Sequence, residues 1–193
     1  MGPMSSSNPA ALAPEERRLL LELARSSIRR GLCGEALELR GEDYPEALRA
    51  PRANFVTLHV DAMLRGCIGT LEARASLVTD VAHNAQAAAF RDPRFPALTW
   101  PEFERLDIHL SILSVPEPLA FESEEHLLRQ LRPGVDGLIL EEGRRRGTFL
   151  PAVWETLPEP EEFLRNLKRK AGFAAGHWSN AIRVSRYTAE SIP

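Results

Sequence analysis

Apolar residues recur every three or four positions in four stretches of the chain, and this spacing predicts amphipathic helices. The first helix is expected from Pro14 to Gly31 and the second, which is rich in alanine, from Ser76 to Phe90. Two more are expected over residues 123–131 and 160–172. A proline at the first helical position opens the first and the last of them, because its missing N–H would have no partner there.

Other segments predict strands, and most of these strands form hairpins. Asn54–Val60 and Met63–Leu71 flank a two-residue turn, and residues 137–150 predict a second hairpin around two glycines. Single strands are expected over residues 108–115 and 181–187. Hairpins separated by single helices, without strict alternation of strand and helix, favour an α+β fold with mainly antiparallel sheets. We expect two closely packed lobes with flanking helices.

Length and charge narrow the class of protein. The 193 residues suffice for one full core or two small lobes, and we expect a disordered leader over residues 1–12 followed by one domain over 13–193. A net charge of −3 disfavours nucleic-acid binding. The sequence shows no apolar run near the roughly 18 residues of a membrane span, and no signal peptide. Cys33 and Cys67 form no CxxC pair, so we expect reduced thiols in a cytoplasmic protein.

The segment Leu64-Arg65-Gly66-Cys67-Ile68-Gly69-Thr70 is the strongest candidate for chemistry. Glycine inside a strand marks a bulge or a close backbone approach, so Gly66 and Gly69 predict that something fits closely against this strand. Arg65 and Cys67 share a strand face, and a nearby guanidinium favours the reactive thiolate. Cys67 is therefore either a reactive thiol or a structural side chain, because an unpaired cysteine is often inert and buried.

Other residues are also candidates for a functional site, and for each a purely structural role is the alternative. His83, in the following helix, is a candidate base for Cys67, although a lone helical histidine is more often a surface or core residue. The rigid turn Asp92-Pro93-Arg94-Phe95-Pro96 offers an anion site, but a self-contained Asp92–Arg94 pair is the favoured interpretation. Lys170 is a candidate to face a cleft. Neither a metal site nor a cofactor fingerprint is predicted, because the histidines lack ligand spacing.

The run from Leu64 to Thr70 resembles the hallmark of the AMMECR-type domain family, whose bacterial and archaeal members are called AmmeMemoRadiSam system protein A. The resemblance covers roughly residues 14–190. It implies an α+β fold of a larger and a smaller lobe with a cleft between them. The following segments fall in the family's order: Asp92–Pro96, Ser111–Leu113, Gly137–Ile139, Thr148–Pro151, Lys170–Gly172 and Arg186–Glu190.

Two functions of different classes follow. In the first, the chain is an enzyme or enzyme subunit that acts on a small molecule or a modified protein, with Cys67 as nucleophile or carrier and Arg65 and His83 assisting. In the second, the chain is an adaptor, Cys67 is structural, and the partners are the Memo-type protein and the radical-SAM enzyme that the family name implies. Under the first hypothesis, the residues that contact the ligand are Gly66, Gly69, Thr70, Asp92, Arg94 and Lys170.

Overall fold

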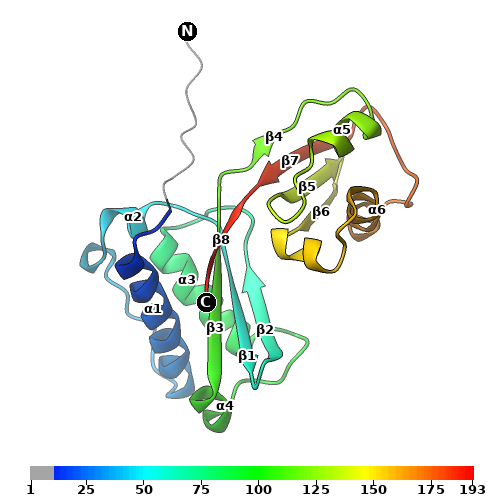
Figure 1. Cartoon of the computed structure of the whole chain (residues 1–193). Coiled ribbons are helices and arrows are strands. Elements are labelled where there is room, and N and C mark those ends of the chain that lie inside the picture. Colours follow the sequence, from blue (N-terminus) through cyan, green and yellow to red (C-terminus); the bar gives the residue numbers. More distant parts are fainter. Residues whose placement is uncertain (1–10) are drawn as a thin grey trace. The chain divides into compact units, whose positions relative to one another are not determined.

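The computed structural model describes residues 11–193, which form two compact units (Figure 1). The first unit extends to Ser114 and includes Glu190–Pro193, and the second is Val115–Ala189. Most of the predicted leader lies outside the described residues, but Leu12 is buried and its N–H donates to the Glu190 carboxylate at 3.1 Å. No helix within residues 11–193 is long and apolar enough to cross a membrane.

The first unit is a four-stranded sheet covered on one face by helices. The strands are β1 (Asn54–Val60), β2 (Met63–Gly69), β3 (Leu106–Leu113) and β8 (Ala189–Ile192), in the order β2-β1-β3-β8. Strand β1 pairs antiparallel with both β2 and β3. The helical elements are α1 (Pro14–Leu32), the 3₁₀ turn η1 (Gly41–Asp43), α2 (Glu46–Arg49), α3 (Leu77–Phe90) and α4 (Trp100–Glu104).

Side-chain alternation along β1 separates the two faces of this sheet. Val56 and Leu58 are fully buried in one core with residues of α1 and α3. Thr57 and His59, at the positions between and after them, therefore point to the opposite face, which we call the open face. The small side chains of α3, including Ala85 and Ala88, let its backbone approach the sheet closely.

The second unit has its own four-stranded sheet and its own core. Trp154 and Phe163 stack within that core, with ring centroids 3.8 Å apart. The strands are β4 (Glu117–Pro118), β5 (Gly137–Glu142), β6 (Arg145–Phe149) and β7 (Arg183–Tyr187), in the order β4-β7-β5-β6. The helical elements are α5 (Glu124–Gln130), the 3₁₀ helix η2 (Pro151–Glu155) and α6 (Pro160–Lys170).

The α+β class is confirmed, and the paired strands of both predicted hairpins are antiparallel. The predicted helices match α1, α3, α5 and α6 within a few residues. The sequence pattern missed β4 and β8, because strands of two and four residues are too short to show a period. The cleft between the two lobes stays a prediction.

Candidate functional site

Cys67 lies on the edge strand β2 and faces away from the helices. It stands opposite Thr57 in the β1–β2 ladder, and residues directly opposite one another share a face. Its Sγ lies 3.3 Å from Thr57 Oγ1, and its side chain is only partly buried. The thiol is therefore on the open face, with a hydroxyl as its hydrogen-bonding neighbour.

The two glycines of the hallmark run do mark close approaches, but to the protein's own backbone. A Cβ added to Gly66 would lie 2.2 Å from the Ala88 carbonyl oxygen of α3. A Cβ added to Gly69 would lie 2.3 Å from the Asn54 carbonyl oxygen of β1. Both positions are therefore explained by packing within the first unit, and a role for either glycine against a ligand stays a prediction.

Arg65 is engaged in a bidentate ion pair with Glu102 of α4. Its Nε lies 2.7 Å from Oε1 and its Nη2 3.3 Å from Oε2, while Nη2 also donates to the Pro96 carbonyl at 2.8 Å. The residue is only 8% exposed. The Arg65 hydrogen bond is the main reason that the pKa of Glu102 falls to about 2. The charge of Arg65 is therefore already compensated within the first unit, and its expected role in binding an anion stays a prediction.

The turn after α3 caps the free edge of β2. Asp92 is buried and accepts the Cys67 N–H at 2.9 Å and the Arg94 guanidinium at 2.7 Å. The Arg94 hydrogen bond is the main cause that holds the pKa of Asp92 well below its ordinary value. Arg94 also donates to the Cys67 carbonyl at 3.4 Å. The favoured self-contained pair is present, and it binds both backbone groups of Cys67.

The other predicted residues do not join this group. His83 is exposed on α3, which covers the face of the sheet opposite to Cys67, so the expected pairing of His83 as base with Cys67 is not supported. Thr70 follows β2 and donates to the Glu72 carbonyl at 3.0 Å. Lys170 belongs to the second unit, where its Nζ lies 5.0 Å from the centre of the Phe149 ring.

Sequence reasoning missed two histidines on the open face. His109 of β3 stands opposite Thr57, and its ring meets the ring of His59 edge-on, with centroids 5.1 Å apart. His109 also bonds Asp107 at 2.8 Å, which is the main reason that the pKa of Asp107 is lowered. Only the register of β1 with β3 could have revealed this pair. Within residues 11–193 no three His, Cys, Asp or Glu side chains are grouped to hold a metal ion.

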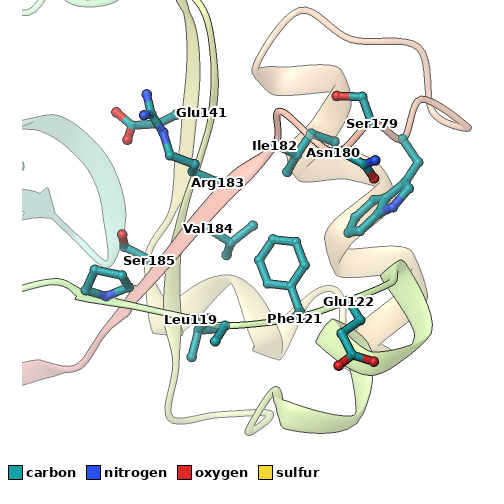
Figure 2. Close-up of a pocket in the computed structure, with 13 residues that line it drawn as sticks. Leu119, Phe121, Glu122, Glu141, Ser179, Asn180, Ile182, Arg183, Val184 and Ser185 are labelled. Atoms are coloured by element: carbon teal, nitrogen blue, oxygen red, sulfur yellow. The ribbon is translucent and has the colours of Figure 1, made fainter.

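The second unit contains a pocket of about 590 Å³ (Figure 2). It lies between residues 118–122, around and after β4, and residues 178–185, which lead into and through β7. Lys168 of α6 is fully buried and bonds Glu124 at 2.7 Å. Its Nζ lies 5.4 Å from the centre of the Trp178 ring, and Trp178 lines the pocket.

These features define a two-unit α+β protein whose hallmark strand is fixed by ion pairs. The AMMECR1 family model matches residues 21–192. A protein of Methanothermobacter thermautotrophicus is 38% identical over 187 residues, covering 94% of this chain and 95% of that protein. One of Thermotoga maritima is 42% identical over 152 residues, covering 77% and 82%.

Among solved structures, the crystal structure of the uncharacterized protein PH0010 from Pyrococcus horikoshii is similar, with a TM-score of 0.85 and 34% identity. The match covers 93% of this chain and 92% of that one. The chain belongs to the AMMECR1 family, which confirms the resemblance found in the sequence.

Proposed function

We propose that the chain is a binding subunit that docks a partner protein through the end of its β1–β2 hairpin and α4. The observation that carries the proposal is the exposure of three large apolar side chains there. Met63 is 72% exposed, Leu64 is 42% exposed and Trp100 is 45% exposed. Met63 and Leu64 are consecutive in β2, and the Arg65–Glu102 ion pair ties α4 to this strand, so the three side chains belong to neighbouring elements. Exposed apolar side chains that lie near one another mark sites of protein interaction. We call these three residues the hairpin–α4 surface.

Two ion pairs link the β1–β2 hairpin to α4 and its C-terminal end, and the less exposed Arg65–Glu102 pair is the one that fixes the surface. Arg65 of β2 bonds Glu102 of α4, and Arg105 bonds Asp61 in the hairpin turn. Figure 1 shows α4 beside the turn between β1 and β2. A surface that is already ordered loses little conformational entropy when a partner binds, which favours recognition over chemistry as its role.

The surroundings of Cys67 also favour binding over catalysis. Among residues 11–193 the hydrogen bonds of the thiol are limited to the one with Thr57. A base within hydrogen-bond reach or an unpaired cation nearby is what commonly activates a catalytic thiol. The charged neighbours Arg65, Asp92 and Arg94 are instead paired with carboxylates or guanidinium groups of the same unit. We propose the Memo-type protein and the radical-SAM enzyme that the family name implies as the partners.

The test is direct binding of each purified partner from the same organism, measured by calorimetry. Trp100→Ser and Met63→Ser should each weaken binding by about tenfold or more, as expected for apolar residues at the centre of an interface. Val135→Ser is the matched control, because Val135 is also 45% exposed but belongs to the second unit. The proposal is wrong if neither partner binds, or if all three variants bind like the parent.

The enzyme hypothesis retains one specific observation, the partly accessible thiol beside Thr57. Alkylation by iodoacetamide tests it, with Cys33→Ala as background because Cys33 is exposed and would react as well. A chemical role requires that folded protein is labelled at Cys67 near neutral pH and that Cys67→Ser keeps the fold. Absence of labelling up to about pH 9, just above the ordinary thiol pKa, would end this hypothesis.

A further inference from the structure

We propose that the pocket of the second unit binds a small aromatic molecule that carries one carboxylate or phosphate group. The pocket is independent of the hairpin–α4 surface, since every residue that lines it belongs to the second unit. Its volume of about 590 Å³ lies within the range of small-molecule sites, roughly 300–1,000 Å³. Its lining combines apolar and aromatic side chains with a few polar groups, as such sites do.

The apolar part of the pocket offers surfaces for a planar ring. Phe121 and Trp178 contact each other with ring centroids 5.6 Å apart and planes inclined by 53°. Ile182 and Val184 lie close by, and Figure 2 shows both side chains near Phe121. Aromatic rings prefer tilted or offset contacts with other rings, so these two walls favour an aromatic ligand over a flexible aliphatic one.

Trp178 is held in place by a buried cation. The ammonium group of Lys168 lies 5.4 Å from the centre of the indole and is 2.7 Å from a Glu124 oxygen. Lys168 has no exposed surface, so its position is set by packing and by Glu124. A tryptophan fixed in this way is a preorganised wall, which lowers the entropic cost of binding a ring.

Arg183 supplies the charge that selects an anion. In the sheet it stands opposite Glu141, and Glu141 in turn stands opposite Arg146. The carboxylate of Glu141 already bonds Arg146 Nε at 3.0 Å. Within the part of the chain that the structure describes, the guanidinium of Arg183 has no partner, and it is exposed at the pocket. Guanidinium groups bind carboxylate and phosphate in bidentate fashion, which matches the proposed ligand.

Glu122 restricts the ligand to one anionic group. Figure 2 shows Glu122 on the opposite side of the pocket from Arg183. It is exposed and, among residues 11–193, its carboxylate has no partner either. A second negative group on the ligand would meet this carboxylate and be repelled. Figure 2 shows Arg183 beside Glu141 and apart from Phe121, so the proposed ligand would reach from the rings of Phe121 and Trp178 to the guanidinium of Arg183.

The experiment titrates isotopically labelled protein with two matched sets of probes, followed by NMR. The first set is indole-3-acetate, indole-3-acetamide and tryptamine, which share the indole ring and carry an anionic, a neutral and a cationic side group. The second set is AMP and adenosine, which tests phosphate against carboxylate as the anion. We expect the anionic member of at least one set to bind at least about tenfold more tightly than its neutral analogue, with shifts at residues 178–185. The tenfold figure is that of one charge-assisted hydrogen bond.

Arg183→Gln should remove that preference, and Arg165→Gln should leave it unchanged. Arg165 is an exposed arginine on α6 of the same unit and does not line the pocket. Because Arg183 is exposed, its replacement should keep the fold, which the amide spectrum reports. The proposal is overturned if no probe shifts residues 178–185 at millimolar concentration. It is equally overturned if tryptamine binds best, or if Arg183→Gln binds the anion as tightly as the parent.

Discussion

Replacing Arg65 with alanine removes one guanidinium and leaves the Glu102 carboxylate without its main partner. Two sites lose hydrogen bonds in this change, because Arg65 also donates to the Pro96 carbonyl. If the arginine stabilises the fold, the variant should lose stability. If it is instead available to a ligand, as the sequence suggested, stability should hardly change.

The pKa of Glu102 gives the expected magnitude. It falls from 4.5 to about 2 in the folded protein, with the Arg65 hydrogen bond as the largest cause and Thr99 as a smaller one. At 1.36 kcal/mol for each pH unit, this difference corresponds to about 3 kcal/mol of stability. Removing one member of a buried pair costs about 3–5 kcal/mol, and the Glu102 side chain is 25% exposed, so the lower end applies. We expect Arg65→Ala to lower the free energy of unfolding by about 3 kcal/mol.

The pH dependence of the stability loss shows whether it comes from the ion pair or from lost packing of the arginine side chain. Because the folded pKa of Glu102 is depressed, its contribution is complete above its ordinary pKa and is lost as the pH falls toward about 2. In Arg65→Ala the pKa of Glu102 should return toward its ordinary value. The gap in unfolding free energy between parent and variant should therefore be widest near pH 7 and shrink below about pH 4.

Urea unfolding at several pH values measures this gap. Arg105→Ala is the matched control, because Arg105 pairs with Asp61 and both side chains are more than half exposed. An exposed pair contributes about 0–1 kcal/mol, so the control should remain close to the parent. A loss below about 1 kcal/mol in Arg65→Ala, no greater than in the control, would refute the structural role and restore Arg65 as a candidate ligand-binding group.

Two further predictions concern single groups. Gly66→Ala should destabilise the protein by at least about 1–3 kcal/mol, because the added Cβ would lie 2.2 Å from the Ala88 carbonyl oxygen. Gly41→Ala is the control, because a Cβ there meets open space and should cost little. Urea unfolding compares the two variants, and equal stability would contradict the close approach at Gly66. Glu124→Gln should destabilise the protein more than Lys168→Met. The first change leaves the buried ammonium of Lys168 without a carboxylate partner, whereas the second leaves only the Glu124 carboxylate, which is 36% exposed. Thermal unfolding of the two variants measures the order, and the reverse order would show that Lys168 does not need its partner.

Local sequence patterns predicted most of the helices and hairpins of the fold. The spacing of apolar positions in residues 14–31 predicted a helix with one buried face, and Leu20, Leu23 and Ile28 of α1 are buried, with Leu19 partly buried. The turn Asp61-Ala62 was placed correctly, and both residues have the positive φ that a tight hairpin requires. The order of the strands in each sheet could not be predicted in this way, because it depends on pairing between distant segments. Nothing local in residues 189–192 showed that they join the sheet of the first unit as β8.

The candidate site shows where pattern reasoning ends. Period-two alternation placed Arg65 and Cys67 together, but it could not show that Glu102, far along the chain, would compensate the arginine. The two hallmark glycines correctly signalled close contact, but a glycine does not reveal whether a ligand or the protein's own helix approaches it. The Asp92–Arg94 pair was foreseen because both partners lie in one short turn. Interactions within a few residues were predictable, and those that depend on tertiary contacts were not.

The hallmark strand is held on three sides, and this limits how a partner can bind it. Gly66 packs on α3, Arg65 ties β2 to α4, and the turn at Asp92 satisfies the N–H of Cys67 on the outer edge. A free edge strand offers unpaired backbone groups to another chain, and here the groups of Cys67 are occupied by side chains. Addition of a partner strand at this position would have to break the buried Asp92 interaction first. Docking through the exposed side chains Met63 and Leu64, beyond the capped part of the strand, requires no such loss.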